Sequence, residues 1–373
     1  MTSSLENVSK DGRVCFPEPD GSCLCASYAT RVVLPTLYVL MFLLGLPGNL
    51  MSLWIFIKKI HSKTSTHIYL VSLGASNLLL CLTMPFQAAY LAAGTDWNMQ
   101  QMVCRIAISG VTPLLHISIY VGVFILTWIA LSRCALLVQN DYGGRPSTCT
   151  RLLPPVFFRK LRQASFARAT CAATWLFVLS CVLPVSIYYS VQEVVQKDDL
   201  VSQGCYRVAV EVGGNSTQKS SIVAIMLFCM CFIVVMACYI SVVRHFIRSQ
   251  RSRIVLDKQR MYSHVFRKIV VIQAVLIVCL LPYHVFKAVF IDRAWRQSRP
   301  SADGCHPMSQ FVEIKNFLLC LAALRCNTDP IMYLLLDKTF RKNALEMFNV
   351  CIGSQSSQST GSNMAEGPTF SQS

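Results

Sequence analysis

Residues 221–243 read SIVAIMLFCMCFIVVMACYISVV and contain no charged side chain. An α-helix needs about 20 apolar residues to cross the hydrocarbon core of a bilayer, because each residue adds about 1.5 Å of rise. The apolar character of the stretch is continuous and does not alternate, which is typical of a membrane helix and not of a β-barrel strand. The stretch therefore predicts a helix that spans a membrane.

The same pattern recurs along the chain. Seven runs are long and apolar enough to span a bilayer: 32–57, 67–93, 103–137, 168–190, 220–246, 267–291 and 309–336. Several contain a proline, which a packed bundle tolerates because neighbouring helices can satisfy the freed carbonyl groups. We therefore expect an all-α membrane protein built as a seven-transmembrane helix bundle.

The composition agrees with a membrane protein. Hydrophobic residues make up 54% of the chain and charged residues only 14%, against about 25% charged in soluble domains. The net charge is +16. The basic residues behind it are distributed between the apolar runs and do not form one patch, so they indicate membrane topology and no nucleic-acid polymer as partner. Cysteines inside the runs are expected to be small buried hydrophobic residues, namely Cys81, Cys181, Cys229, Cys231 and Cys279. Because no Cys/His set has zinc-ligand spacing, we expect no metal and no cofactor.

Lys and Arg placement predicts the orientation. The basic loops at 58–66, 138–167 and 247–266 should face the cytosol, which puts the N-terminus outside a multi-pass protein of the plasma membrane. Two glycosylation sequons, at Asn7 and Asn215, fall on the predicted outside. The first thirty residues have no apolar core, so we expect no cleaved signal peptide and the first span to act as the insertion signal.

Three segments follow from this topology. Residues 1–31 should form an extracellular N-terminal segment, 32–342 the membrane domain, and 343–373 a cytoplasmic tail. The tail is rich in Ser, Gln and Gly and is expected to be largely disordered. Its serines are either phosphorylation sites, through which arrestin could bind, or unmodified residues of a solvated tail.

The spans also carry, in order, residues that resemble the rhodopsin-like G-protein-coupled receptors. The matching residues are Gly48-Asn49, Cys104, Arg133, Trp175, Cys205, the Cys279–Pro282 string and the Asp329–Tyr333 string. The resemblance implies a disulfide between Cys104 and Cys205, a short amphipathic helix from Asp337 to Lys342, and a palmitoylated Cys351. It also implies a heterotrimeric G protein as partner, with Arg133, Tyr239 and Tyr333 as the switch residues.

A narrower resemblance is to the nucleotide-receptor group and its lipid-sensing relatives. It rests on Asp329 before Pro330 and on Pro282-Tyr283-His284 with Lys287 in span six. The resemblance implies that His284, Lys287 and Lys315 bind a small anionic ligand, of the nucleotide or lysophospholipid type. A phosphate would supply the charge-assisted hydrogen bonds that a half-buried lysine lacks.

Alternatives remain at this outer end. The two lysines could instead extend to the outer water, with Glu313 or Asp292 nearby. His284 alone is more typical of a packed core histidine. Cys305, between spans six and seven, could pair with Cys15, Cys23 or Cys25 and so tether the N-terminus.

The centre of the bundle departs from the family pattern. Asn77 stands where span two of the family has an Asp that helps to bind sodium. Arg325 lies one helical turn before Asp329, and a guanidinium at that depth needs a partner. We expect Arg325 to pair with Asp329 and no sodium to bind; the alternative is an Arg325 solvated by water.

The switch region departs as well. The chain has Ser132-Arg133-Cys134 in place of the family's Asp-Arg-Tyr, so Ser132 cannot hold Arg133 by an ion pair. Without that ion pair, the receptor could signal without ligand, or it could couple only weakly to a G protein; the sequence leaves both alternatives open. Basic loops could in addition contact anionic membrane lipids. A transporter is disfavoured because the spans lack repeats, and an enzyme because no catalytic motif is present.

Overall fold

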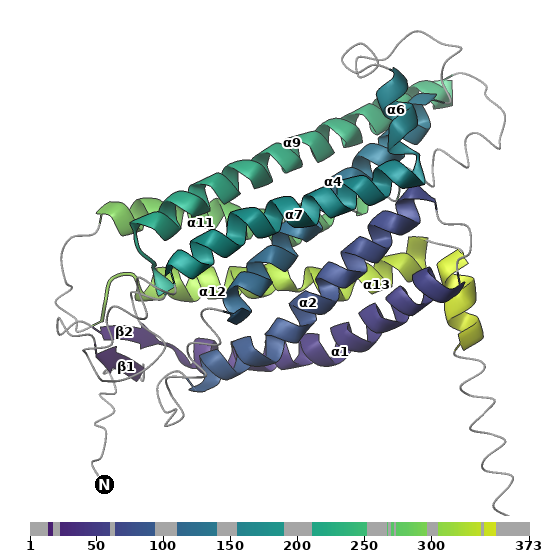
Figure 1. The fold of residues 1–373 in the computed structure, drawn as a ribbon. Coiled ribbons are helices and arrows are strands. Elements are labelled where there is room, and N and C mark those ends of the chain that lie inside the picture. Colours follow the sequence, from purple (N-terminus) through teal and green to yellow (C-terminus); the bar gives the residue numbers. More distant parts are fainter. Residues whose placement is uncertain are drawn as a thin grey trace, which may run out of the picture.

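The computed structural model describes residues 14–17, 23–59, 64–93, 110–139, 155–189, 211–251, 267, 270–271, 274–296, 305–336 and 339–347. The chain is an all-α seven-transmembrane bundle, as predicted, with its helices running side by side (Figure 1). The family's short helix is also present: the described residues 339–347 are helical, which includes Thr339–Lys342 of the expected Asp337–Lys342 and continues beyond it. We call the end of the bundle that carries the strands β1 and β2 the hairpin end, and the end that carries residues 339–347 the tail end.

Where their ends are described, the spans agree with the apolar runs to within about five residues, and the start of the third run, 103–109, lies outside the described residues. Six have the length and hydropathy of a membrane helix in the described ranges. Their elements are η1 (Ala29–Val33) with α1 (Leu34–Trp54) and η2 (Ile55–Lys59), α2 (Ser65–Ala93), α4 (Thr112–Gln139), α7 (Ala164–Tyr189), α9 (Asn215–Arg251), and α12 (Ser309–Ala323) with α13 (Arg325–Leu336). The sixth span in chain order is described from residue 274 and contains η5 (Leu276–Leu280) and α11 (Leu281–Arg296).

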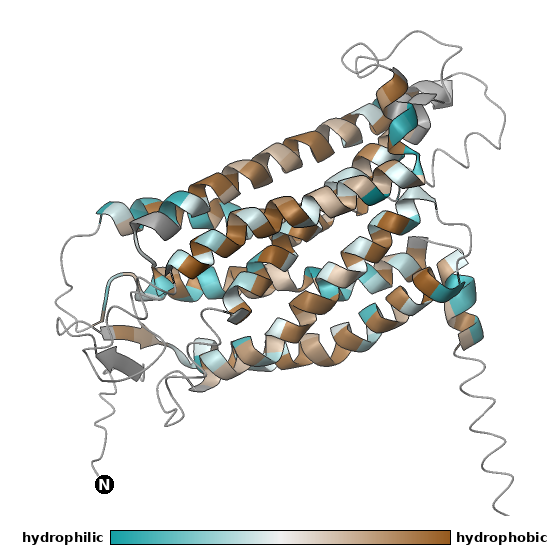
Figure 2. Ribbon diagram, in the orientation of Figure 1, coloured by the Kyte–Doolittle hydropathy of each residue, from teal (hydrophilic) through white to brown (hydrophobic). Residues whose placement is uncertain are grey.

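The helices are mostly hydrophobic at mid-length and more hydrophilic towards their ends (Figure 2), and large apolar side chains are exposed on their outer faces. Leu44 and Ile233 are 71% and 65% exposed on these faces. Such exposure of large apolar side chains fits a bilayer as surrounding solvent. Cys181 and Cys229 are exposed there too, so the prediction that they are buried was wrong, while Cys81, Cys231 and Cys279 are buried.

The N-terminal segment holds two strands that the sequence did not lead us to expect. β1 (Val14–Pro17) pairs antiparallel with β2 (Cys23–Ala26). A disulfide joins Cys25 to Cys305, with a Cα–Cα distance of 5.7 Å, so Cys25 is the partner among the three alternatives. The backbone N–H of Cys25 also donates to Ser309 Oγ at 3.1 Å. These contacts hold β2 against the start of α12.

Two spans depart from a regular α-helix, each for a local reason. In span six, the π-helical turn η5 ends two residues before Pro282. A proline has no N–H to donate to the preceding turn, and a π-turn is one way to reroute those hydrogen bonds. In span seven, Leu324 separates α12 from α13. This break places Arg325 at the first position of α13.

The tail end contains two short helical segments that close the bundle. The helix α6 (Pro155–Leu161) lies within the predicted loop 138–167 and packs against α4 and α7. The helix over residues 339–347 buries Phe340, whose ring lies 5.2 Å from that of Phe56 and 5.8 Å from that of Tyr333. Apolar anchoring therefore fixes both segments beneath the spans.

Glycines allow close approach where α1 meets span seven. A Cβ at Gly45 would lie 2.8 Å from Asn327 Oδ1, and one at Gly48 would lie 3.3 Å from Pro330. The Gly48-Asn49 motif therefore has a packing reason in this chain. Between α2 and α7, the Trp175 indole N–H donates to Ser72 Oγ at 3.0 Å.

Candidate functional site

A cavity of about 510 Å³ opens at the hairpin end of the bundle, within the size range of small-molecule sites. Side chains of α2, α4, α7, α9, α11 and α12 form its walls, and most of them are apolar. The polar lining includes Gln87, Tyr90, His116, Tyr120, Glu211, Gln218, Tyr283, Lys287, Lys315 and Asn316. Lys287 and Lys315, both predicted from the sequence, therefore face the same cavity.

Lys315 has a partner that the sequence did not indicate. Its ammonium donates to Glu211 Oε2 and to the Glu211 carbonyl oxygen, both at 2.6 Å. The same carboxylate accepts hydrogen bonds from Tyr90 Oη at 2.6 Å and from Asn316 Nδ2 at 3.3 Å. Glu211 lies four residues before α9, and Gly213 follows it with a φ of 75°, a conformation that favours glycine and lets the chain turn into the helix.

The carboxylates expected near the lysines have other partners. Glu313 accepts hydrogen bonds from the Ser27 backbone N–H and from Thr30 Oγ1, and Asp292 pairs with Arg296 at 2.9 Å. Among the described residues, neither Glu313 nor Asp292 forms an ion pair with Lys287 or Lys315. Glu211 could not have been found from local spacing, because it is 104 residues away from Lys315.

Lys287 has no carboxylate within 4.0 Å among the described residues. Its side chain is half-buried, and its ammonium lies 5.5 Å from the centre of the Tyr283 ring. An aromatic face stabilises a cation only weakly compared with a carboxylate. In the described part of the cavity, Lys287 is the cation without a counter-charge.

His284 lies beneath the cavity and is not part of its wall. It is 1% exposed and stacks on Phe228 with ring centres 3.8 Å apart. Its Nδ1 lies 2.8 Å from the Leu280 carbonyl oxygen, whereas Nε2 has no hydrogen-bond partner within the described ranges. A ligand contact by His284 would therefore require the layer above it, which includes Tyr120 and Tyr283, to move.

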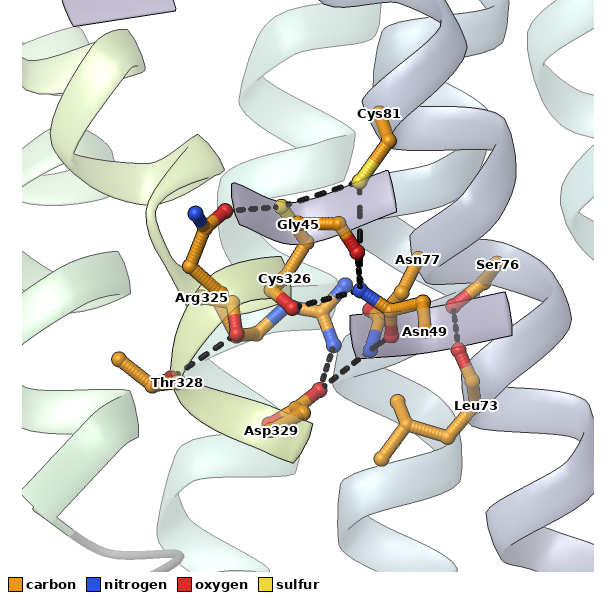
Figure 3. A network of polar contacts seen from close by, with 11 residues as sticks. Gly45, Asn49, Leu73, Ser76, Asn77, Cys81, Arg325, Cys326, Thr328 and Asp329 are labelled. Carbon is orange, nitrogen blue, oxygen red and sulfur yellow. Dashed lines mark hydrogen bonds and ion pairs between the residues drawn. The ribbon is translucent and has the colours of Figure 1, made fainter. Parts of the chain in front are cut away.

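The centre of the bundle holds a buried polar network that joins α1, α2 and α13 (Figure 3). Arg325 Nη1 lies 3.2 Å from Asp329 Oδ2, and both side chains are fully buried. Asn77 Nδ2 donates to the same carboxylate oxygen at 2.8 Å and to Asn49 Oδ1 at 3.2 Å. The structure thus brings the three predicted core residues together.

The network extends towards the hairpin end through Asn49. Its amide donates to the carbonyl oxygens of Gly45 and Cys326, both at 2.9 Å. The thiols of Cys81 and Cys326 lie 3.6 Å apart above it. These contacts fix the polypeptide on either side of the ion pair.

Several polar atoms in and beside the network have no hydrogen-bond partner among the described residues. They are Arg325 Nε and Nη2, Asp329 Oδ1, Asn77 Oδ1 and the Tyr333 hydroxyl. Donors and acceptors are both present in this set, so water could bridge them. A second cation such as sodium would have to compete with the guanidinium for Asp329.

Gly122 on α4 makes room for the guanidinium. A Cβ at this position would lie 2.3 Å from Arg325 Nη2 and 2.5 Å from Cζ. Gly122 could not be identified from the sequence, since a glycine in a long apolar run gives no signal of which side chain crosses it.

The predicted switch residues lie at the tail end. Arg133 is half-buried in the last two turns of α4, and Tyr239 is half-buried in the second half of α9. The thiols of Cys134 and Cys238, which neighbour them, are hydrogen-bonded to each other. The Tyr333 ring packs edge-on against Phe56 with centres 5.2 Å apart.

Other predicted residues lie outside the described part of the chain or at its edge. Cys104, Cys205, Asn7 and Cys351 fall outside the described residues. Asn215 is the first residue of α9 and not part of the loop in which it was expected.

Comparison with known proteins agrees with this architecture. The model of the rhodopsin-family seven-transmembrane receptors matches residues 48–146 and 150–333. The chain is 38% identical over 328 residues to the human "Probable G-protein coupled receptor 82", covering 88% of this chain and 95% of that receptor. The mouse receptor of the same name is 37% identical over 324 residues, covering 87% and 96%.

A more distant relative is the human "Uracil nucleotide/cysteinyl leukotriene receptor". It is 27% identical over 311 residues, covering 83% of this chain and 75% of that receptor. Both the family match and the relatives are receptors, and not enzymes. The chain therefore belongs to the rhodopsin-like G-protein-coupled receptors, in the group that resembles the nucleotide receptors.

Proposed function

We propose that this receptor binds a small anionic ligand, of the nucleotide or lysophospholipid type, in the cavity at the hairpin end and couples to a heterotrimeric G protein at the tail end. The hairpin end would face the outside of the plasma membrane. The positive charge of the loops at the tail end supports this orientation.

The observation that carries the ligand class is the position of Lys287. A half-buried ammonium without a carboxylate is costly, and a bound anion would remove that cost through charge-assisted hydrogen bonds. The cavity around it is largely apolar, which would strengthen the attraction relative to water. Lys287 is therefore the residue that would hold the anionic group.

Lys315 and His284 would take secondary roles. Lys315 is neutralised by Glu211, so it would bind an anion directly only after that ion pair opens. His284 would act from below, where it sets the position of Phe228 and Tyr283. The name of one relative, a receptor for uracil nucleotides and cysteinyl leukotrienes, supports an anionic ligand, since both classes carry negative charge.

Coupling to the G protein would pass through the tail end. Ligand binding would favour a second arrangement of the bundle in which Arg133, Tyr239 and Tyr333 contact the G protein. Ser132 is buried next to Arg133 and cannot pair with it as an Asp would. The inactive state is therefore held without the family's usual ion pair at this position.

Further contacts are proposed for the segments near the membrane. Palmitate on Cys351 and anionic lipids on the basic loops would hold the tail end at the bilayer. Arrestin would bind the serine-rich tail after phosphorylation. Glycans on Asn7 and Asn215 would mark the outside, so their removal by a glycosidase added to intact cells tests the orientation.

The experiment is a G-protein dissociation assay in cells, with nucleotides and lysophospholipids as candidate agonists. We expect at least one of them to activate the receptor and Lys287→Ala to raise the half-maximal concentration by at least tenfold. Lys219→Ala is the matched control, because Lys219 is exposed on α9 and does not line the cavity. If an agonist kept the same potency on Lys287→Ala and on the double variant Lys287→Ala/Lys315→Ala, the proposed anion site would be overturned.

A further inference from the structure

The helices α4 and α9 pack against each other along a seam that leads towards the tail end of the bundle. The seam residues are buried and recur at helical spacing, so on each helix they share one face. They are Thr127, Ala130 and Cys134 on α4, and Cys231, Val235, Cys238 and Val242 on α9.

Two side-chain contacts fix the register of this seam. The Cys231 thiol is hydrogen-bonded to the Thr127 hydroxyl, and the thiols of Cys134 and Cys238 are hydrogen-bonded to each other. From the first contact to the second, both helices advance by the same seven residues, from 127 to 134 and from 231 to 238, which is about two turns. The two helices therefore run parallel here, and the closed seam holds the two thiols together.

This thiol pair lies directly beside two of the predicted switch residues. Cys134 follows Arg133 on α4, and Cys238 precedes Tyr239 on α9. The two cysteines are 4% and 5% exposed, and neither is part of a disulfide in this structure. A covalent bond between the two sulfur atoms would therefore fix the backbones that carry Arg133 and Tyr239 relative to each other.

We propose that Cys134 and Cys238 form a reversible disulfide when the cytosol becomes oxidising, and that this bond locks α4 to α9 in the arrangement of the present structure. The inference rests on the proposed function for the cytosolic position of the tail end and for the part of Arg133 and Tyr239 in coupling. It goes further because it adds a chemical input at the tail end that does not use the ligand cavity. Disulfides of cytosolic proteins are usually transient and redox-sensing, which fits a pair of this kind.

The oxidant is hydrogen peroxide, which is small and uncharged and can therefore reach a buried thiol. The first thiol, as its thiolate, attacks a peroxide oxygen: an S–O bond forms, the O–O bond breaks, and the leaving hydroxide takes up the released proton to give water. The second thiol attacks the sulfenic sulfur: an S–S bond of about 2.05 Å forms, the S–O bond breaks, and a second water leaves with the proton of the second thiol. Two electrons pass from the sulfurs to the peroxide, and the sum is one disulfide and two waters.

The first test maps the bond in the full-length receptor in lipid nanodiscs. The receptor is treated with hydrogen peroxide, digested without a reducing agent and analysed by mass spectrometry. We expect peptides joined through Cys134 and Cys238. Cys81→Ala is the matched control, because it removes the thiol pair between Cys81 and Cys326, and the joined peptides should remain. If peroxide joined no peptides through Cys134 and Cys238, the inference would be overturned.

The second test asks whether the bond fixes the two helices. Amide hydrogen exchange in the tail-end half of α9 should slow by at least tenfold after peroxide, and G-protein dissociation should fall by at least tenfold. Both should recover after dithiothreitol, and neither should respond to peroxide in Cys238→Ala or Cys134→Ala, which remove the bond independently. Dithiothreitol also reduces the disulfide between Cys25 and Cys305, so Cys238→Ala taken through the same cycle gives the baseline.

Each remaining outcome decides one of the two proposals. Joined peptides with unchanged exchange and signal would overturn the lock, because the bond would then form without fixing the helices. A loss of signal that persists in both alanine variants would overturn it as well, since oxidation elsewhere would be the cause. Slowed exchange in a receptor that activates no G protein even when reduced would support the lock and contradict the proposed signalling function.

Discussion

Replacement of Gly122 by alanine should destabilise the receptor through Arg325, on the neighbouring span. The added Cβ would lie 2.3 Å from Nη2, 2.5 Å from Cζ and 2.6 Å from Nη1. Unbonded atoms of this kind approach to about 3.5 Å, so the guanidinium would have to retreat by about 1 Å. It has little room to do so, because the Arg325 side chain is fully buried.

Two effects set the magnitude. Overpacking a filled interior costs about 1–3 kcal/mol. If the retreat also breaks the 3.2 Å contact between Arg325 and Asp329, a buried charge loses its partner, which costs about 3–5 kcal/mol. We therefore expect Gly122→Ala to lower the free energy of unfolding by about 1–3 kcal/mol if the ion pair survives and by up to about 5 kcal/mol if it does not.

The assay is thermal unfolding of the purified receptor in detergent, followed by a thiol-reactive or tryptophan signal. Gly110→Ala is the matched control, since a Cβ there meets nothing within 4 Å. The same Gly122→Ala change is then made in a background with Arg325→Met and Asp329→Asn, where the cost should fall below about 1 kcal/mol because the clash and both charges are gone. An equal loss of stability in the two backgrounds would refute the reasoning.

Three further predictions concern the core, the hairpin end and the ligand charge. Agonist affinity should be the same in sodium and in N-methylglucamine chloride, because the buried ion pair already neutralises the acidic group of span seven; a clear sodium effect would count against the pair. Cys25→Ser should speed hydrogen exchange of residues 23–27 by at least tenfold, because loss of the bond to Cys305 frees the strand, and unchanged exchange would show that packing alone holds it. Glu211→Gln should raise the affinity for dianionic ligands by at least tenfold, because it removes the negative charge that neutralises Lys315. If the change altered the affinity for neither monoanions nor dianions, Glu211 would not set the charge of the site.

The fold could be predicted from the sequence because its main determinant, the long apolar run of each span, is an uninterrupted stretch of the chain. A run such as 221–243 must form a helix in lipid whatever surrounds it, since its backbone has no other source of hydrogen bonds. The pairing of Arg325 with Asp329 follows for a similar reason, as four residues on one helix bring the two side chains to the same face. Local rules were sufficient for both.

The rest depends on contacts between distant segments. Nothing near Glu211 in the sequence shows that its carboxylate will accept hydrogen bonds from Tyr90 and Lys315, which belong to two different spans. The strand Cys23–Ala26 also forms only because β1, a disulfide and α12 hold it in place. Such partners are decided by packing of the whole bundle and not by local pattern.

The exposure of single residues on α7 and α9 was likewise beyond sequence reasoning. Val223 and Met230 are both apolar residues in one run, and the pattern does not tell a cavity wall from a lipid contact. The same holds for Cys181, which was expected to be buried and is exposed. Only the relative position of the two helices distinguishes these side chains.

The central claim is that this chain is a receptor that activates a heterotrimeric G protein through Arg133. The most direct measurement is a G-protein dissociation panel on the intact receptor and on Arg133→Ala, at matched surface amounts, with and without the anionic ligands named above. We predict dissociation of at least one G protein by the intact receptor and its loss in Arg133→Ala. An equal signal from both forms, or no dissociation under any condition, would contradict the account.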